Sequence, residues 1–199
     1  MIVSKMKIME SFINKSSGIL TIDELKQQNI NKYYINKLID KGVIERYEKG
    51  IYVRKDVFED EYYIFQKRNS NVIFSYNTAL YLQNMTERTP LKIEITIYSG
   101  YNTHRFSNNI KVYYVKKEYL SLGTIQVKTP FGFDVAAYNL ERTLCDFIKN
   151  ENAKLDKEMT NKFIQKMFLE KKVDTSKLIE YAKKLKCEKK VRGVMEVLM

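Results

Sequence analysis

The sequence has little of what most catalytic and metal sites are built from. Its 199 residues include one histidine, His104, and two cysteines, Cys145 and Cys187. Two cysteines cannot form a disulfide framework, and alone they cannot supply the four ligands of a structural zinc site. A single histidine makes most histidine-based hydrolytic schemes improbable. We therefore expect no cofactor, no metal and no catalytic residue, and the protein is predicted not to be an enzyme.

Glycine, proline and long apolar runs are also scarce. The seven glycines are isolated, so the chain has no glycine-rich phosphate loop. With two prolines and 44% hydrophobic residues, the chain has the composition of a packed domain rather than a disordered one. No apolar run approaches the roughly 18 residues of a membrane span, and the first ten residues lack the apolar stretch of a signal peptide. This composition predicts a soluble, cytoplasmic protein with no membrane partner.

Positive charge is what the sequence has in excess. The net charge of +11 is unevenly spread, with +5 in residues 1–55, −2 in residues 56–69, +3 in residues 70–150 and +5 in residues 151–199. A basic surface favours polyanionic partners because association releases condensed counterions. An ordinary basic protein can have the same balance, so charge alone leaves nucleic-acid binding open.

The first 55 residues predict three helices followed by a β-hairpin. Thr21 and Glu24 have the spacing of a capping box, Asn31 is placed to cap the next helix, and Gly42 is its expected stop. Apolar residues recur at helical spacing in each helix, and two β-branched and aromatic runs flank a glycine-containing turn. The expected helices are residues 5–14, 22–28 and 32–41, and the expected strands are residues 43–47 and 51–53. This order is that of a winged helix-turn-helix domain.

In a winged helix, the third helix enters the major groove and the hairpin reaches the neighbouring backbone. Asparagine can bond to adenine in a bidentate manner, and lysine can reach guanine or phosphate. The candidate DNA-binding residues lie off the apolar face of the third helix and on the hairpin: Lys32, Tyr33, Asn36, Lys37, Arg46 and Lys49. The alternative is that these polar side chains only solvate a winged helix that binds other proteins.

The rest of the chain predicts a connecting helix and a second domain. Residues 56–69 are expected to form a helix that joins the winged helix to an α+β domain at residues 70–199. The expected strands there are residues 72–74, 92–98, 110–115, 124–128 and 133–137; the expected helices follow Ser75 and Asn139, and three helical stripes occupy residues 151–199. The predicted fold class is α+β, with an N-terminal winged helix-turn-helix domain followed by a mixed α+β domain and a helical C-terminal tail.

Polar residues of the second domain have both a catalytic and a structural interpretation. Cys145 and His104 lie on different elements, and Cys145 falls on an apolar helix face, which favours a buried structural cysteine. Glu94 lies on a strand without the lysine two residues later that metal-nuclease cores carry, so a solvated carboxylate is expected. Arg142 and Asp146 share a helix face and are expected to form a structural ion pair.

A lysine-rich stretch near the C-terminus is either a solvated face or a second surface for DNA or another phosphate polymer. Its basic residues are Lys183, Lys184, Lys186, Lys189, Lys190 and Arg192. The sequence favours neither interpretation, because a solvated helix and a polyanion surface can have the same pattern.

Four segments in order resemble the AbiEi antitoxins, the antitoxin half of type IV abortive-infection toxin–antitoxin systems. The first ends the winged helix, and the others follow through the second domain to its tail. They are Leu38–Tyr52, Ser75–Leu80, Thr129–Gly132 leading to Asn139–Asp146, and Val191–Leu198.

The resemblance implies two activities. The N-terminal domain would bind double-stranded DNA, at inverted repeats of the operator in its own promoter, and repress the operon. The C-terminal domain would counteract a cognate nucleotidyltransferase-like toxin without forming a stable complex with it. The resemblance supplies no catalytic residue.

Two other interpretations remain open at this point. The chain can be a stand-alone transcriptional regulator whose C-terminal domain binds a small ligand, which a deep apolar pocket in residues 70–150 would favour. It can also be a nucleic-acid-processing enzyme, which a tight carboxylate cluster with a divalent ion would favour.

Overall fold

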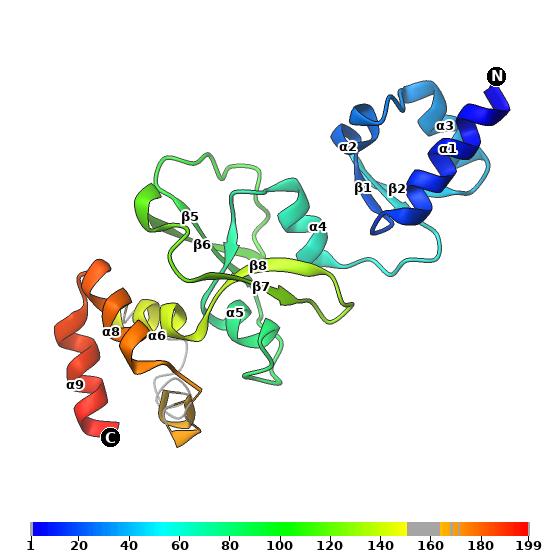
Figure 1. Cartoon of the computed structure of the whole chain (residues 1–199). Coiled ribbons are helices and arrows are strands. Elements are labelled where there is room, and N and C mark those ends of the chain that lie inside the picture. The colour runs from blue at the N-terminus through cyan, green and yellow to red at the C-terminus, as the bar shows by residue number, and fades with distance from the viewer. Residues whose placement is uncertain (1, 151–163, 168, 171, 199) are drawn as a thin grey trace. The chain divides into compact units, whose positions relative to one another are not determined.

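The chain forms two compact units (Figure 1). The computed structural model describes residues 2–150, 164–167, 169–170 and 172–198. Unit 1 is Met1–Ser70 together with Thr129–Phe133, and unit 2 is Asn71–Lys128 together with Asp134–Met199. Among the described helices, none is both long enough and apolar enough to cross a membrane.

Unit 1 contains the three expected helices and the hairpin, with one more strand. In order, its elements are α1 (Ile2–Lys15), β1 (Ile19–Thr21), α2 (Ile22–Gln27), α3 (Lys32–Asp40), β2 (Ile44–Glu48), β3 (Ile51–Arg54) and α4 (Glu61–Arg68). Strands β1 and β2 both pair antiparallel with β3, so the sheet order is β1-β3-β2. The helices pack on this sheet around an apolar core that includes Ile13, Leu25 and Leu38. The architecture confirms the predicted winged helix-turn-helix.

Short-range signals set the helix boundaries of unit 1 as expected. The hydroxyl oxygen of Thr21 accepts a hydrogen bond from the Glu24 amide at 3.1 Å, and the Glu24 carboxylate accepts one from the Thr21 amide at 2.8 Å. The Asn31 side chain accepts a hydrogen bond from the Tyr34 amide at 3.3 Å and starts α3. Gly42 follows α3 with a φ of +68°, a conformation that costs glycine little.

The helix expected in residues 56–69 is shorter than predicted. It begins at Glu61, because the Asp60 side chain caps it by accepting a hydrogen bond from the Tyr63 amide at 3.0 Å. The expectation that Val57 is already helical is therefore wrong. Lys55 and Asp56 instead form a turn, and the buried Asp60 carboxylate fixes where the helix starts.

Helix α4 is tied to the winged helix by one apolar and two ionic contacts. Ile64 is buried among residues of β1 and β3. Lys67 forms an ion pair with Glu24 of α2 at 2.9 Å, and Arg68 forms one with Glu48 of β2 at 2.6 Å. These contacts explain why α4 belongs to unit 1.

The turn Thr129–Phe133 also belongs to unit 1. The Thr129 amide donates to the Phe133 carbonyl at 2.8 Å, and Gly132 has a φ of +86°. The Phe133 ring stacks on Tyr63 of α4, with ring centroids 4.5 Å apart. The Thr129–Gly132 motif of the sequence is thus a tight turn, and Phe133, which follows it, packs on α4.

Unit 2 is a mixed five-stranded sheet with helices, as the α+β prediction requires. Its elements are β4 (Ile73–Phe74), α5 (Tyr76–Leu82), β5 (Ile93–Tyr98), β6 (Ile110–Val115), a 3₁₀ turn (Lys117–Tyr119), β7 (Thr124–Lys128), β8 (Asp134–Tyr138), α6 (Leu140–Lys149), α8 (Thr175–Lys184) and α9 (Glu188–Leu198). The strand order is β6-β5-β4-β8-β7. Strand pairs β5–β6 and β4–β8 are parallel, and the other two pairs are antiparallel.

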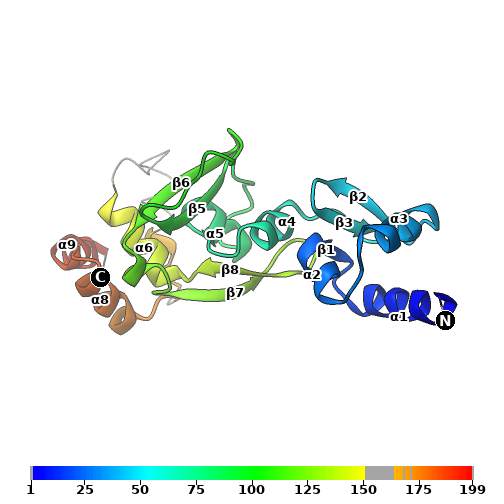
Figure 2. The same cartoon turned by 90° about the horizontal axis from the view of Figure 1, so that it is seen from above.

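The helical tail closes unit 2 against α6. Leu144 of α6, Leu178 of α8 and Val191 of α9 are buried in one apolar cluster, and both views show α8 and α9 beside α6 (Figures 1 and 2). Of the first expected helical stripe, Ile164 and Met167 are buried in the same cluster, whereas Met159, Phe163 and Phe168 lie outside the described residues.

Candidate functional site

The outer face of α3 carries four of the candidate DNA-binding residues. Ile35 and Leu38 point into the core of unit 1, which fixes the rotation of the helix. The candidates that this rotation leaves at the surface are Lys32, Tyr33 and Asn36, which are exposed, and Lys37, which is half-buried. None of the four is part of the apolar core.

Two of these residues contact each other, and two have no described partner. The Lys37 ammonium lies 5.0 Å from the centroid of the Tyr33 ring, and Tyr33 is 54% exposed. Hydrogen bonding to Tyr33 raises the pKa of Lys37 above its ordinary value. Within the described residues, Lys32 and Asn36 form no side-chain hydrogen bond and no ion pair. Their polar atoms are available to a ligand.

The hairpin of the winged helix presents the other two candidates. Arg46 lies on β2 opposite Tyr52, and Lys49 lies in the turn; both are exposed. The neighbouring Glu48 is the acidic residue nearest to Lys49 in sequence, and its carboxylate is paired with Arg68 of α4. Because Arg68 neutralises Glu48, the tip of the hairpin keeps a positive charge. The sequence pattern did not indicate this role for α4.

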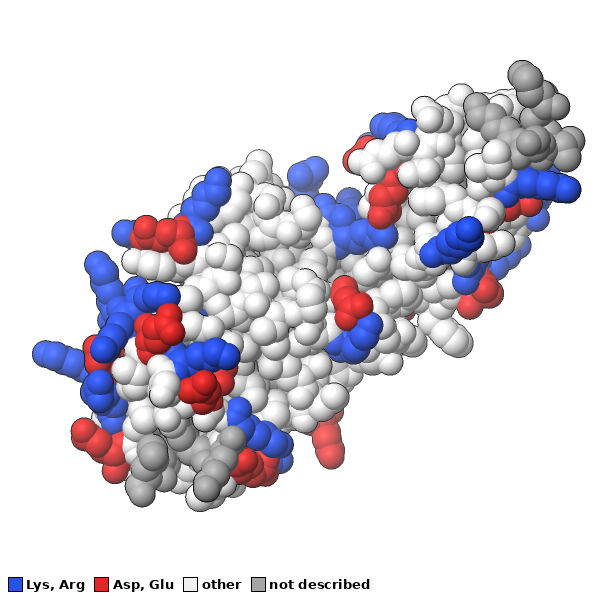
Figure 3. Space-filling model, in the orientation of Figure 1, with Lys and Arg blue, Asp and Glu red and all other residues white. Residues whose placement is uncertain are grey.

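The basic residues of the C-terminal stretch lie at the end of α8, in the following turn and at the start of α9. All six are exposed, and Figure 3 shows basic side chains gathered at this end of unit 2. Lys184 is paired with Glu180 at 2.6 Å, and Arg192 is paired with Glu188 at 2.8 Å. These i, i+4 pairs reduce the charge that the stretch offers to a polyanion.

Arg142 and Asp146 form the expected ion pair, and it is buried. The Arg142 Nε lies 3.0 Å from both Asp146 oxygens, and Arg142 is 0% exposed. Its Nη1 donates to the carbonyls of Tyr119 and Leu122, and the guanidinium lies 4.2 Å from the Tyr138 ring centroid. Burial raises the pKa of Asp146 to about 6, an effect that Arg142 opposes. The pair fastens α6 to the turn that precedes β7.

Glu94 is not solvated, so that expectation is wrong. It is 2% exposed, and one carboxylate oxygen accepts hydrogen bonds from the Asn77 amide at 2.8 Å and from the Asn77 side chain at 2.7 Å. The other oxygen accepts one from the Tyr113 hydroxyl at 3.0 Å and lies 3.2 Å from the Lys111 ammonium. Glu94 is buried because strand β5 is covered on both faces. Its hydrogen bonds connect β5 to β6 and to α5.

The carboxylate of Glu94 also does what the sequence assigns to Ser75. Ser75 is the N-cap residue of α5, but its hydroxyl makes no hydrogen bond within the described residues. The next residue, Tyr76, has a φ of +49°, and its ring stacks on Tyr113 with centroids 3.8 Å apart. A non-glycine residue with a positive φ is strained. Stacking on Tyr113 and the hydrogen bonds from the start of α5 to Glu94 keep Tyr76 in this conformation.

The thiol and the histidine do not form a nucleophile and base. Cys145 is fully buried in the apolar cluster of the tail, and hydrogen bonding to Cys187 together with burial raises the pKa of its thiol. His104 is exposed on the loop between β5 and β6. Among the described residues, no three histidine, cysteine, aspartate or glutamate side chains are placed to hold a metal ion.

Three helices, an antiparallel wing and an accessible third helix define unit 1 as a winged helix-turn-helix domain of the kind found in transcriptional regulators. Residues 6–55 match the family model described as "transcriptional regulator, AbiEi antitoxin", which confirms the resemblance over the first of its four segments, Leu38–Tyr52. Residues 6–55 are thus similar to a family of transcriptional regulators that is described as the AbiEi antitoxin. The match covers 50 of the 199 residues. No curated protein matches the chain.

Proposed function

We propose that the chain is a DNA-binding antitoxin of a type IV system that acts in the cytoplasm and represses its own operon through residues 1–55. The observation that supports DNA binding is the outer face of α3, where Lys32 and Asn36 are exposed and have no described partner. A lysine and an asparagine on the accessible face of this helix suit phosphate and base-edge contacts respectively.

The two remaining parts of the DNA surface have complementary roles in this proposal. Tyr33 and Lys37 act together, because the ring lies under the ammonium and restrains it next to the DNA backbone. Arg46 and Lys49 on the hairpin contact the neighbouring backbone, as the wing does in this class of domain. Inverted repeats in the operator would then be bound by two copies of the chain.

In the second half of the proposal, residues 70–199 of this chain counteract a nucleotidyltransferase-like toxin without forming a stable complex with it. The family of the N-terminal domain supports an antitoxin role for the whole chain. Unit 2 has its own sheet and its own apolar cluster, so it can act independently of the DNA-binding residues. In this proposal the basic stretch of α8 and α9 is a second phosphate surface.

The separation of the two roles can be tested with Lys49→Ala expressed from an unrelated promoter. We expect the variant to lose repression of a promoter–reporter fusion and to keep its rescue of growth against the toxin from the neighbouring gene. Lys26→Ala is the matched control, because Lys26 is an exposed lysine of unit 1 that lies on α2 and is not one of the candidate DNA-binding residues. Loss of rescue at a normal protein level would contradict the separation, and unchanged repression would contradict the role of the wing.

A further inference from the structure

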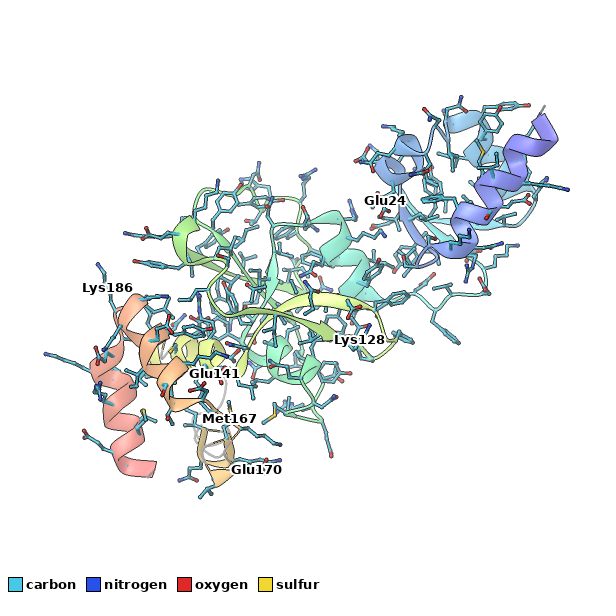
Figure 4. The ribbon with its side chains drawn as sticks, in the orientation of Figure 1. Glu24, Lys128, Glu141, Met167, Glu170 and Lys186 are labelled. Atoms are coloured by element: carbon cyan, nitrogen blue, oxygen red, sulfur yellow. The ribbon has the colours of Figure 1, made fainter. Side chains whose placement is uncertain are left out.

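Unit 2 contains an open cavity of about 490 Å³ at the carboxyl ends of β5 and β6. Ser99 directly follows β5 and Lys116 directly follows β6; Lys149 comes from the end of α6, and Lys186 from the turn between α8 and α9, where Figure 4 labels it. The volume is typical of small-molecule sites, and the carboxyl ends of parallel strands are a common place for them. The lining residues all belong to unit 2 and lie outside the family match.

The walls of the cavity carry an excess of positive charge. Lys149 and Lys186 have no ion pair within the described residues, and Lys116 has one weak contact, 4.0 Å from Glu118. Asp146 also lines the cavity, but both its oxygens are bonded to Arg142. The carboxyl ends of α6 and α8 contribute roughly half a negative charge each, which is less than three ammonium groups supply. The cavity therefore suits an anion with several charges.

Aromatic and amide groups complete the lining. Tyr114 is 51% exposed, and its hydroxyl is held by the Thr103 hydroxyl at 2.8 Å, which fixes the ring. Tyr76 and Asn150 also line the cavity. A fixed, half-exposed ring is a stacking platform for a flat heterocycle, and an amide can donate to and accept from its edge.

We propose that this cavity binds a nucleoside di- or triphosphate, with its phosphates at Lys116, Lys149 and Lys186 and its base on Tyr114. Three point charges match a polyphosphate better than a single carboxylate or sulfate. The stacking platform distinguishes a nucleotide from an inorganic polyphosphate. The proposal does not depend on DNA binding by α3 or the hairpin, because none of these residues lies there; only Lys186 is shared with the basic C-terminal stretch.

The test uses the full-length protein and calorimetric titration with ATP, GTP, CTP and UTP, each with and without Mg²⁺. Inorganic triphosphate and the four nucleosides are the comparison ligands. We expect at least one nucleotide to bind about tenfold more tightly than inorganic triphosphate and than its own nucleoside, because both halves of the site contribute. Absence of binding at millimolar nucleotide would overturn the proposal. Equal affinity for inorganic triphosphate would overturn the base contact and with it the nucleotide assignment.

Five variants localise the binding to the cavity. Lys149→Ala and Lys186→Ala should each weaken nucleotide binding about fivefold or more, since each removes a phosphate contact. Lys177→Ala is the matched control, because Lys177 is exposed on α8, does not line the cavity and is not part of the basic C-terminal stretch, and it should change the affinity less than about twofold. Tyr114→Leu should weaken binding about fivefold, whereas Tyr114→Phe, which keeps the ring, should retain it. An equal loss in the control and in the cavity lysine variants would show non-specific attraction and overturn the assignment.

Discussion

The outer face of α3 and the interior of unit 2 use charged side chains in opposite ways. On α3, Lys32 is exposed and has no described partner. In unit 2, Arg142, Asp146 and Glu94 are almost completely buried, and each forms several hydrogen bonds to the protein. The buried groups maintain the fold, whereas a charge without a protein partner is available to a ligand.

The buried and the exposed charges should differ in how much their removal lowers the stability of the protein. Removing one member of a buried ion pair leaves the other desolvated and unpaired, which costs about 3–5 kcal/mol of stability. Removing an exposed charge changes stability by about 0.5 kcal/mol or less. Variants of the two regions should therefore separate cleanly into those that unfold the protein and those that only weaken its binding to DNA.

The largest effect is expected for Arg142→Ala. The substitution leaves Asp146 buried without its partner and frees two carbonyls of the turn before β7, so unit 2 should lose about 3–5 kcal/mol of stability. Urea denaturation followed by circular dichroism measures this loss. Lys128→Ala breaks an exposed pair with Asp134 and should cost less than about 1 kcal/mol. Similar costs for the two variants would contradict the contrast between buried and exposed charges.

A smaller loss is expected for Glu94→Gln. The amide keeps one acceptor oxygen but presents an NH₂ group to donors, so either the α5 cap or the Tyr113 and Lys111 contacts are lost, at a cost of about 1–3 kcal/mol. The same denaturation experiment measures it, with the exposed Glu118→Gln as the control. If Glu94→Gln is as stable as the control, the carboxylate is not the cap of α5.

Local signals predicted much of the fold because they act over a few residues. The capping box of Thr21 and Glu24, the Asn139 cap and the Arg142–Asp146 pair all join residues three or four positions apart. Each is determined by helix geometry and does not depend on the rest of the fold. The positions of these residues in the sequence were therefore enough to predict the contacts.

Contacts between distant segments were not predictable in this way. In the expected strand 92–98, Ile93, Ile95 and Ile97 alternate with other residues, a pattern that predicts one buried face, but the structure buries both faces of β5 and Glu94 with them. The pairing of Lys67 with Glu24 joins two helices whose packing no local pattern specifies. The same reasoning applies to the cavity, since Lys116, Lys149 and Lys186 come from three separate elements.

The candidate DNA-binding residues of α3 were predictable from the sequence only in part. Helical periodicity correctly placed Ile35 and Leu38 inside and Lys32 and Asn36 outside. Periodicity cannot say which outward residue touches DNA, because every solvated helix has a polar face. The assignment of these residues to DNA stays a prediction, which binding measurements test.

The third prediction concerns the base-reading residue of α3. Asn36→Ala should cost about 1–3 kcal/mol of binding free energy on operator DNA and little on random DNA, because only a base-edge contact depends on sequence. The stability of the protein should change by about 0.5 kcal/mol or less, since Asn36 is exposed. Titrations of both DNAs at one salt concentration measure the difference. An equal loss on the two DNAs would assign Asn36 to the phosphate backbone.

The smallest effect is expected for Lys32→Ala, and it is best seen in the salt dependence. Lys32 lies in the first turn of α3, where its charge opposes the helix dipole, and no described acidic residue compensates it. A phosphate oxygen would compensate it in the complex. The substitution should weaken binding to operator and random DNA alike and lower the magnitude of the slope of log affinity against log salt by about one.

Lys26→Ala on α2 provides the control for this slope, because it removes an equal charge from another exposed site of unit 1. Its slope should stay unchanged, since a charge that contacts no phosphate releases no counterion on binding. If both lysine variants lower the slope equally, the effect reflects net charge rather than a contact at Lys32. If neither Lys32→Ala nor Asn36→Ala alters operator affinity in a folded protein, α3 is not the reading helix, and the winged helix serves as a protein-interaction module.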